Sequence, residues 1–577
     1  MINLKINNIP VSVEEGTTIC EAARVLGIKI PTLCHMKELN EIGACRICVV
    51  EVVGMKNLVA SCVYPVREGM EVLTNTPKVI YSRKTTIELI LSDHRKDCLS
   101  CERNTNCELQ SLAYKYGCDA TRFIGKTRPF TQDTTTDYLV RDNSKCILCR
   151  RCVAVCHQQQ QVGVIGANDR GFATHIGCAF DLPLNSISCI GCGQCINVCP
   201  TGALKERSEV GNVIDALGDK TKTVIVGAAP SVRVALAEEF GAPVGSDCLG
   251  KMYRALKIAG FDKVFDINFG ADFTIMEEGY ELIDRIKNNK TLPMFTSCCP
   301  GWIRFVEFYY PDLIPNLSTC KSPQQMFGAL VKTYYAQKTG LDPENIYTVA
   351  IMPCTAKKFE KVRDGEDEDG QRDIDAVLTT RELARLLMRN GIQLLDLEDD
   401  KPDNPMSEYS GAGAIFGASG GVMEAALRTA VEVLDGKNLD AIDFTQVRGA
   451  EGIKEASYWA GGRQLKVAVA NGITNAKKIC DDVRAGKCDY QFIEVMTCPG
   501  GCVNGGGQPI KATFVKHKDE VKQLRAQSLY EEDRNMPIRK SHLNESVQQV
   551  YKEYLGQPGG ECAHEILHTR FIARKKY

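Results

Sequence analysis

The sequence lacks the features of several protein classes. A transmembrane helix needs about 18 consecutive apolar residues, and no stretch of the 577 residues comes near that length. The first residues, MINLKINNIP, have no apolar core of the kind found in signal peptides, so we expect a cytoplasmic location. A formal net charge of −2 gives no basic excess for binding nucleic acid or an anionic membrane.

Nucleotide-binding motifs are also missing. There is no P-loop, and the glycine-rich run SGAGAIFGASGG (410–421) does not fit G-x-G-x-x-G, so we expect no nicotinamide or flavin site on this chain. HEILH (564–568) matches the zincin pattern H-E-x-x-H, but no third ligand is in view. We interpret HEILH as a helical segment that packs against the rest of the protein.

Cysteine, in contrast, is abundant, with 28 residues that occur in clumps. Disulfides suit small secreted domains, whereas clustered cysteines in a large chain without a secretion signal indicate metal or redox chemistry. Apart from cysteine, the amino-acid composition is that of a soluble globular protein, with 44% hydrophobic and 25% charged residues. The length predicts three or more domains.

The first segment predicts a small β-grasp, ferredoxin-like unit. INLKI and VSVEE have the pattern of strands, and Thr18 with Glu21 forms a capping box for a helix that ends at Gly27. The four cysteines that follow depart from the plant-type ferredoxin spacing, but they suit a [2Fe–2S] cluster. A zinc ribbon is the alternative, although ribbons usually carry two short C-x2-C pairs. The expected ligands are Cys34, Cys45, Cys48 and Cys62.

The next group contains a histidine. In HRKDCLSCERNTNC, the histidine lies four residues before a C-x2-C pair, within reach of the same metal. A zinc site with one histidine and three cysteines is chemically reasonable, but the neighbouring clusters favour a [4Fe–4S] cluster with one imidazole ligand. The expected ligands are His94, Cys98, Cys101 and Cys107.

The most specific pattern is a pair of C-x2-C-x2-C-x3-C runs, CILCRRCVAVC (146–156) and CIGCGQCINVC (189–199). In bacterial two-cluster ferredoxins the fourth cysteine of each run binds the other cluster. One [4Fe–4S] cluster is therefore assigned to Cys146, Cys149, Cys152 and Cys199, and the second to Cys156, Cys189, Cys192 and Cys195. We interpret the sixteen candidate ligands of these groups as a chain of redox centres that carries electrons to a distant site.

After about residue 209, short apolar runs such as TVIVGAAP alternate with helical stretches such as GGVMEAALRTAVEVL. This alternation predicts an α/β fold with mostly parallel sheets. Three runs end in or near cysteine, and loops at the carboxyl ends of parallel strands are where open α/β folds bind ligands. We expect these cysteines to meet at one crevice, with buried structural cysteine as the alternative. They are Cys298, Cys299, Cys354, Cys498 and Cys502.

Three of these segments resemble the signature segments of [FeFe]-hydrogenases: TSCCPGW (296–302), MPCTAKKFE (352–360) and EVMTCPGGCVNGGGQ (494–508). The resemblance extends over essentially the whole chain. It implies reversible oxidation of H2 at an H-cluster, which is a [4Fe–4S] cluster joined to a di-iron unit with CO, cyanide and dithiolate ligands. By resemblance, the protein ligands are Cys299, Cys354, Cys498 and Cys502, the last of which also bridges to the di-iron unit.

The resemblance also implies roles for residues around that cluster. Lys357 would contact a cyanide ligand, and Ala229, Pro230, Ser231 and Gln324 would act nearby in the same role. Met352, Phe416 and Met496 would supply an apolar lining. A proton route would run from Cys298 through Glu278, Ser318 and Glu281 to Arg285. From the residues alone, core packing and a solvated acidic face remain the alternatives.

The expected fold class is multidomain α+β and α/β. Its parts are a β-grasp [2Fe–2S] domain at 1–78, a [4Fe–4S] domain with one histidine and three cysteine ligands at 79–137, and a two-[4Fe–4S] ferredoxin domain at 138–208. A two-lobed α/β H-cluster domain with a C-terminal helical tail completes it at 209–577. The cofactor set is thus one [2Fe–2S] cluster, three accessory [4Fe–4S] clusters and the H-cluster.

The expected electron partners are ferredoxin or partner subunits that bind flavin and NAD(P), and maturation proteins would install the di-iron unit. The hypothesis of a multisubunit enzyme rests on two stretches, DHRKDCLSCERNTNCELQ and CILCRRCVAVC (146–156). The first of them resembles the large Fe–S subunit of respiratory complex I. The alternatives are a non-catalytic electron-transfer subunit of that type, a hydrogenase-like Fe–S assembly factor and a sensory hydrogenase. We interpret the cysteines without a spacing partner as structural: Cys20, Cys118, Cys178, Cys248, Cys320, Cys480, Cys488 and Cys562.

Overall fold

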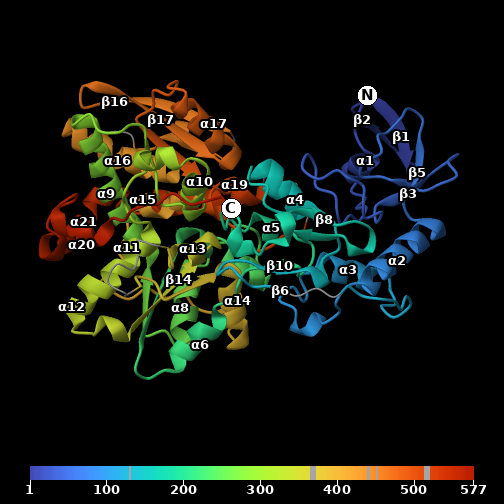
Figure 1. Ribbon diagram of the computed structural model, residues 1–577, viewed down its shortest axis with the longest axis horizontal. Coiled ribbons are helices and arrows are strands. Elements are labelled where there is room, and N and C mark those ends of the chain that lie inside the picture. Colours follow the sequence, from blue (N-terminus) through green and yellow to red (C-terminus); the bar gives the residue numbers. More distant parts are fainter. Residues whose placement is uncertain (129–131, 364–371, 438–441, 450–451, 513–519, 577) are drawn as a thin grey trace.

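The chain runs from a row of small N-terminal units into a larger α/β unit (Figure 1). The computed structural model describes residues 1–128, 132–363, 372–437, 442–449, 452–512 and 520–576. In Figure 1 the N-terminus lies at the far end of the row, and the C-terminus lies near the middle of the molecule, beside the junction of the two parts. No helix within these ranges has the length and apolar character that crossing a membrane requires.

The first unit is a five-stranded sheet with one helix. Its strands, in the sheet order β2-β1-β5-β3-β4, are β2 (Ile9–Val13), β1 (Ile2–Ile6), β5 (Glu71–Leu73), β3 (Val49–Val52) and β4 (Val59–Ala60). Helix α1 (Ile19–Val25) begins with the expected capping box of Thr18 and Glu21. Gly27 follows it with a φ of +73°, a conformation that glycine adopts without steric cost.

The next two units combine a few helices, short strands and long connecting loops. The first of them contains α2 (Pro77–Ser92), the single turn η1 (Cys98–Ser100) and α3 (Glu108–Lys115). The second contains α4 (Arg151–Ala154), α5 (Gln194–Val198), the three-stranded sheet β10-β7-β6 and the hairpin β8-β9. The bounds of these strands are Leu204–Lys205, Val140–Asp142, Gln132–Asp133, Gly166–Asn168 and His175–Gly177. Most of the cysteines lie in the loops rather than in the helices or strands.

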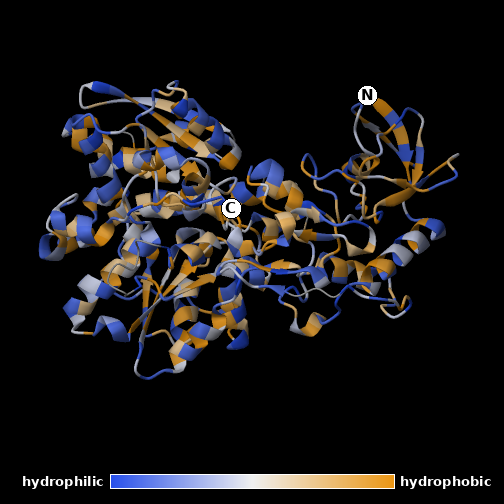
Figure 2. Cartoon of the chain, viewed as in Figure 1, coloured by the Kyte–Doolittle hydropathy of each residue, from blue (hydrophilic) through white to orange (hydrophobic). Residues whose placement is uncertain are grey.

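The larger unit contains two four-stranded sheets, which agree with the mostly parallel sheets that the alternating pattern predicts. The first sheet is wholly parallel, in the order β12 (Lys263–Asp266), β11 (Thr223–Ala228), β14 (Ile346–Met352) and β15 (Ala376–Thr379). Helices α6 (Val210–Gly218), α8 (Leu249–Ile258) and α14 (Thr380–Arg389) belong to the same lobe. Figure 2 shows that its strands are largely hydrophobic, which is typical of parallel strands covered on both faces.

The second sheet is mixed. Its order is β13 (Met294–Phe295), β18 (Phe492–Met496), β17 (Arg463–Asn471) and β16 (Ile453–Ala460). The first three strands run parallel, and β16 is an antiparallel edge strand. Helices α10 (Pro300–Tyr309) and α17 (Ile473–Arg484) contribute to the core on one side of the sheet, and α16 (Gly421–Asp435) contributes on the other.

One long helix, α9 (Ile267–Lys287), joins the two lobes. Phe269 and Phe273 belong to the core around the first sheet, whereas Ala271 and Ile275 belong to the core around the second. Its neighbours include α11 (Pro323–Leu330) and α16. A helix that packs against other elements on opposite sides is apolar around most of its surface. The buried polar residues of α9 are therefore exceptions that need partners.

The C-terminal segment returns across the larger unit as α19 (Glu520–Asn535), α20 (Glu545–Val550) and α21 (Glu561–Leu567). It is attached by backbone hydrogen bonds, from Lys321 N to Leu567 O at 2.8 Å and from Thr569 N to Thr319 O at 2.8 Å. HEILH therefore lies at the end of α21, where the chain packs against the loop before α11.

Candidate metal centres and active site

The three cysteine-bearing loops meet in one cavity between the two sheets of the larger unit. Cys298 and Cys299 follow β13, Cys354 follows β14, and Cys498 follows β18. Cys502 begins the single turn η14 (Cys502–Asn504) and lines the same cavity. The expectation of a common crevice is confirmed, although β14 belongs to one sheet and β13 and β18 to the other.

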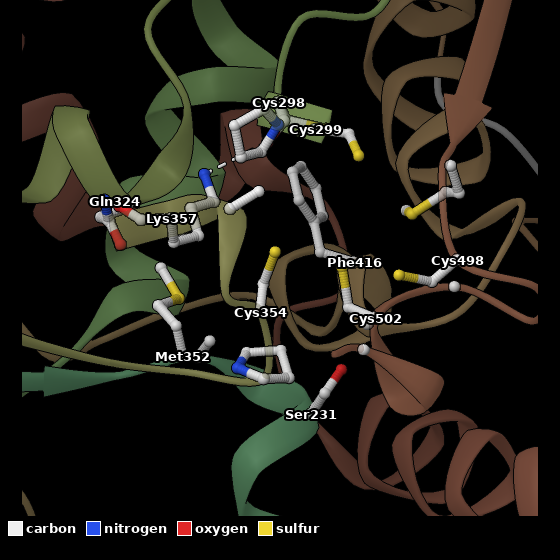
Figure 3. Close-up of a pocket in the computed structure, with 18 of the residues that line it drawn as sticks. Ser231, Cys298, Cys299, Gln324, Met352, Cys354, Lys357, Phe416, Cys498 and Cys502 are labelled. Carbon is white, nitrogen blue, oxygen red and sulfur yellow. Dashed lines mark hydrogen bonds between the residues drawn. The ribbon is translucent and has the colours of Figure 1, made fainter. Parts of the chain in front are cut away.

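Four of these thiols form a plausible donor set for an iron–sulfur cluster. Figure 3 shows the sulfur atoms of Cys354, Cys498 and Cys502 directed into the same space. Burial raises the pKa of the Cys354 thiol to about 12, so a metal must displace its proton on binding. Cys299 Sγ lies 3.2 Å from Thr497 Oγ1. Cysteine thiolates are the donors that Fe–S clusters prefer.

The polar part of the cavity wall is built around Lys357. This residue lies in the short helix α13 (Ala356–Glu360), and its Nζ donates to Ser322 Oγ at 2.7 Å, Glu360 Oε2 at 2.8 Å and Cys298 O at 3.2 Å. Gln324 Nε2 donates to the same Glu360 carboxylate at 3.1 Å. The lysine is thus held at the cavity by a buried carboxylate.

Two buried polar atoms at the cavity have no hydrogen-bond partner among the described residues. They are Ser231 Oγ and Gln324 Oε1, both on residues that line the cavity. Burying a polar group without a partner costs free energy, so such atoms indicate a missing ligand. A group with polar or anionic ligands of its own, such as the H-cluster, fits this combination of thiols, lysine and unpaired polar atoms.

The rest of the wall is apolar and closely packed. Met352, Phe416 and Met496 line it, as do Ala229 and Pro230 at the start of α7 (Pro230–Arg233). The glycine-rich run 410–421 contributes Gly417, where a Cβ atom would lie 2.3 Å from Ser231 Oγ. This run therefore allows a close approach between two segments of the chain beside the cavity.

The residues of the expected proton route lie on one side of the cavity. Glu278 is fully buried on α9, and its Oε1 accepts a hydrogen bond from Ser297 N at 3.3 Å. Burial, and then the negative charge of Glu281, raises the pKa of Glu278 to about 8. The Glu278 charge in turn contributes, after burial, to a pKa of Cys298 well above its ordinary value. The two groups are therefore electrostatic neighbours.

The outer half of the route is a continuous set of hydrogen bonds. Ser318 lies beside Glu278 and stabilises the ionised form of that carboxyl. The Oγ of Ser318 donates to Glu281 Oε2 at 2.8 Å. Arg285 donates to Glu281 Oε1 through Nε at 3.0 Å and Nη2 at 2.6 Å. Glu278 and Glu281 lie on the same face of α9, as their spacing predicts. Glu281 is the first member of the set with a partly exposed side chain, at 13%.

The two ferredoxin-type cysteine sets lie around separate spaces. Cys146, Cys149, Cys152 and Cys199 line one cavity, and Cys156, Cys189, Cys192 and Cys195 line another. In each case the fourth cysteine of a run groups with the other run. Cys192 also lines the larger cavity between the sheets, so the second set directly adjoins it.

Close backbone contact joins these two cavities. A Cβ atom on Gly506 would lie 2.3 Å from Cys192 O, and one on Gly193 would lie 2.9 Å from Gly506 Cα. Thr355 Oγ1 also donates to Gly191 O at 2.7 Å. Only glycine permits backbones to approach so closely, and a short separation favours electron transfer between groups held in the two cavities.

The two remaining cysteine groups pack against the first ferredoxin set. In the first unit, Cys48 Sγ and Cys62 Sγ are 3.2 Å apart, and Asn40 Nδ2 donates to Cys149 O at 3.0 Å. Cys107 Sγ lies 3.6 Å from Pro200 O, next to Cys199.

The second of these groups lies on one continuous segment. His94 follows α2, Cys98 begins η1, and Cys107 precedes α3. Nδ1 of His94 is buried with no hydrogen-bond partner in the described ranges, and burial lowers the pKa of this imidazole to about 4. A neutral imidazole with an unpaired nitrogen is suited to metal binding.

Sequence reasoning missed several residues that line the cavity or support its wall. Glu360 lies three residues after Lys357, and this helical spacing could have indicated the ion pair. Ser322, Thr497 and Gly417 carry no comparable signal, because their positions depend on how distant segments pack. Glu494 is a further buried carboxyl, and burial raises its pKa to about 7.

Successive parts of the chain match different protein-family models. Residues 1–77 match a 2Fe–2S cluster binding domain, 83–122 the iron–sulfur binding region of NADH-ubiquinone oxidoreductase G, and 145–203 a 4Fe–4S dicluster domain. Residues 222–506 match the iron only hydrogenase large subunit, C-terminal domain, and residues 519–574 match the iron hydrogenase small subunit. The chain is 44% identical to the NADP-reducing hydrogenase subunit HndD of Solidesulfovibrio fructosivorans, over all of both chains. The chain belongs to the iron-only, or [FeFe], hydrogenases.

Other relatives agree with this family. Iron hydrogenase 1 of Clostridium pasteurianum is 46% identical over 99% of this chain and 100% of its own. Among solved structures, a variant of the [FeFe]-hydrogenase HydA1 from Chlamydomonas reinhardtii is 42% identical, with a TM-score of 0.56. It covers 64% of this chain and 99% of its own length. This hydrogenase therefore carries regions that the algal chain does not match.

Proposed function

We propose that this [FeFe]-hydrogenase oxidises H2 and reduces protons reversibly at an H-cluster held in the cavity between its two sheets. The observation that carries the proposal is the meeting of five cysteines from three loops around one apolar cavity with a buried lysine. An electron-transfer subunit would need no such cavity beyond its cluster sites. Membership of the family supports the catalytic reading over both non-catalytic alternatives.

The ligand assignment remains that of the cysteine patterns. Cys299, Cys354, Cys498 and Cys502 would hold the H-cluster, and the ferredoxin-type sets would hold two [4Fe–4S] clusters. The β-grasp domain at 1–78 would hold a [2Fe–2S] cluster, and the domain at 79–137 a [4Fe–4S] cluster with His94 as one ligand. The contacts of Asn40 with Cys149 and of Cys107 with Pro200 support two branches that join at the first ferredoxin cluster.

The H-cluster, when bound, supplies the two-electron chemistry of H2. The protein must then move protons between the cavity and solvent. Cys298 would carry a proton at the cavity, since its high pKa keeps the thiol protonated near neutral pH. Glu278 is suited to the next transfer. A carboxyl with a pKa of about 8 can both accept and release a proton near neutral pH at little cost in free energy. Ser318 and Glu281 would complete the route to Arg285.

Lys357 would hold an anionic ligand of the cluster at the inner wall. Its hydrogen bonds to Ser322 Oγ, Cys298 O and the Glu360 carboxylate fix the position of the ammonium group. Ser231 and Gln324 would supply further polar contacts. Met352, Phe416 and Met496 would exclude water, which strengthens these contacts because the local dielectric is low.

For the electron partner, we favour subunits that bind flavin and NADP. Two observations support this: the full-length similarity to an NADP-reducing hydrogenase subunit, and the match of residues 83–122 to an NADH-ubiquinone oxidoreductase region. Anaerobic purification of the native protein with its bound partners tests the proposal. Co-purification of a flavoprotein is expected, whereas a lone chain that turns over with ferredoxin only would contradict it.

The catalytic proposal is tested by producing the chain anaerobically together with hydrogenase maturation proteins. We expect H2-dependent reduction of a viologen dye and H2 evolution from the reduced dye. The chain produced without maturation proteins is the control, and it should hold iron but give no turnover. No H2 activity in the matured chain, with full iron content, would contradict the proposal.

A further inference from the structure

We propose that Glu281, Cys320 and His568 form a binding site for Zn²⁺ beside the proton route. A carboxylate oxygen, the thiol sulfur and an imidazole nitrogen of these residues all lie within 4.8 Å of one another. They come from three separate segments: helix α9, the loop before α11 and the chain just after α21. Oxygen, sulfur and nitrogen donors of this kind are the usual ligands of four-coordinate zinc, and three of them leave one position for water.

The imidazole of His568 is oriented as in a metal ligand. Its Nε2 lies 3.1 Å from Glu277 Oε2, and Glu277 also accepts hydrogen bonds from Gly559 N at 2.8 Å and from Tyr551 Oη. Because a carboxylate oxygen accepts hydrogen bonds, Nε2 of His568 is the nitrogen that carries the ring proton and donates to Glu277. Nδ1 is then unprotonated, and its electron pair can act as an acceptor or as a metal ligand. A carboxylate that holds one ring nitrogen while the other binds metal is a common outer-shell arrangement.

The backbone fixes the spacing of the three ligands. Cys320 and His568 face each other in an antiparallel β-bridge, and hydrogen bonds from Lys321 to Leu567 and from Thr569 to Thr319 flank it. Cys320 Sγ lies 3.6 Å from Glu281 Oε2. Zn–ligand distances are about 2.0–2.3 Å, so small side-chain movements would bring the three donors onto one ion.

The site is close to the surface. Glu281 is 13% exposed and His568 is 5% exposed, and the ring of His564 stacks on His568 at a centroid distance of 4.4 Å. His568 but not His564 belongs to the ligand group, so this is not the two-histidine site of a zincin. Binding would convert the Cys320 thiol to a thiolate and release its proton to solvent. Nδ1 lies 2.7 Å from Thr319 Oγ1, a contact that zinc binding would replace.

A consequence for turnover rests on the proposed proton route. Zn²⁺ would occupy the carboxylate of Glu281 that otherwise accepts from Ser318 and from Thr319 N. A carboxylate bound to a divalent cation has a lowered proton affinity and no longer passes protons near neutral pH. Zinc should therefore inhibit H2 turnover, and removal of zinc by a chelator should restore it.

Binding itself is tested on the full-length chain with its Fe–S clusters but without the di-iron unit, under anaerobic conditions. After addition of ZnCl2 and desalting, we expect one more zinc ion per chain than in Cys320→Ala or His568→Gln. X-ray absorption at the zinc edge should show one sulfur ligand that is absent in Cys320→Ala. Cys562→Ala, which removes a half-buried cysteine of the same C-terminal segment, is the matched control and should bind zinc as the wild type does.

Equal zinc uptake by the wild type and by both ligand variants, with unchanged iron content in all three chains, would overturn the site. Inhibition is measured separately on the matured enzyme, with each variant normalised to its own zinc-free activity. The zinc concentration for half inhibition should rise at least about tenfold in either ligand variant, the loss of about 1.4 kcal/mol of binding free energy. Zinc that binds at these residues without inhibiting would support the site and contradict the role of Glu281 in the proton route.

Discussion

The two sides of the central cavity differ in how they are built. Toward the N-terminus, the chain places thiols in loops of small units, and Cys192 brings the last of these groups to the cavity wall. Toward α9, the chain places carboxyls and a hydroxyl in a tightly packed interior, with Glu278 and Ser318 fully buried. The first side is suited to carry electrons, and the second is suited to carry protons. Electrons would leave the cavity toward the N-terminal units, and protons would leave it along α9.

This difference shows that electrons and protons demand different kinds of environment. Cluster ligands need fixed local spacing, which short loops provide. Proton carriers need pKa values near the working pH, and burial beside another charge provides these, as it does for Glu278. Damage to one side should therefore leave the other side intact.

The largest expected effects separate the neighbouring cysteines. Cys299→Ser should lower the iron content and abolish turnover, because it removes a cluster ligand. Cys298→Ser should keep the full iron content and nearly abolish turnover. Iron analysis and H2 evolution on the same preparations check both results. Normal turnover by Cys298→Ser would show that its thiol carries no proton.

The next effect concerns the carboxyls of α9. Glu278→Gln and Glu281→Gln should each lower turnover by about 10²- to 10⁴-fold, the usual contribution of a positioned proton carrier. Glu277→Gln is the matched control, because Glu277 is buried on the same helix but bonds to His568 and Tyr551. It should keep most of the turnover. A similar loss in all three variants would indicate a general packing defect.

A smaller effect is expected on the electron side. Cys189→Ser should lower dye-linked H2 oxidation by about tenfold or more, about 1.4 kcal/mol in the barrier, because it damages the cluster next to the cavity. Exchange between H2 and D2O needs no electron to leave the cavity and should be retained. Glu278→Gln should lose both activities. If Cys189→Ser lost exchange as well, the two sides would not be separable.

The smallest effect is on stability. Glu278 has a pKa of about 8 in the folded protein and 4.5 as its reference value, so between these pH values the folded state holds a proton that the unfolded chain has released. The free energy of unfolding therefore falls as pH rises through this window. Glu278→Gln removes this titration. The unfolding temperature of Glu278→Gln minus that of the wild type should therefore increase between pH 5 and pH 8. A difference that does not change with pH would contradict the raised pKa.

The comparison also explains what could be predicted from the sequence. The ferredoxin runs were readable because their ligands follow a short fixed spacing, and the strand-end positions of Cys354 and Cys498 followed from the α/β alternation. The proton route was different, since only the family resemblance singled out Ser318, which lies 37 residues from its partner Glu281. Cys320 has no spacing partner, so the sequence alone predicts a structural role. Its neighbours, Glu281 and His568, come together only in the tertiary structure.

The central claim is that the cavity between the two sheets holds an H-cluster. Infrared spectroscopy of the anaerobically matured chain tests it most directly, because bound CO and cyanide absorb in a region free of protein bands. We predict bands of both ligands in the matured wild type and in Cys298→Ser, and none in Cys299→Ser. A matured wild-type chain with full iron content and no such bands would contradict the account.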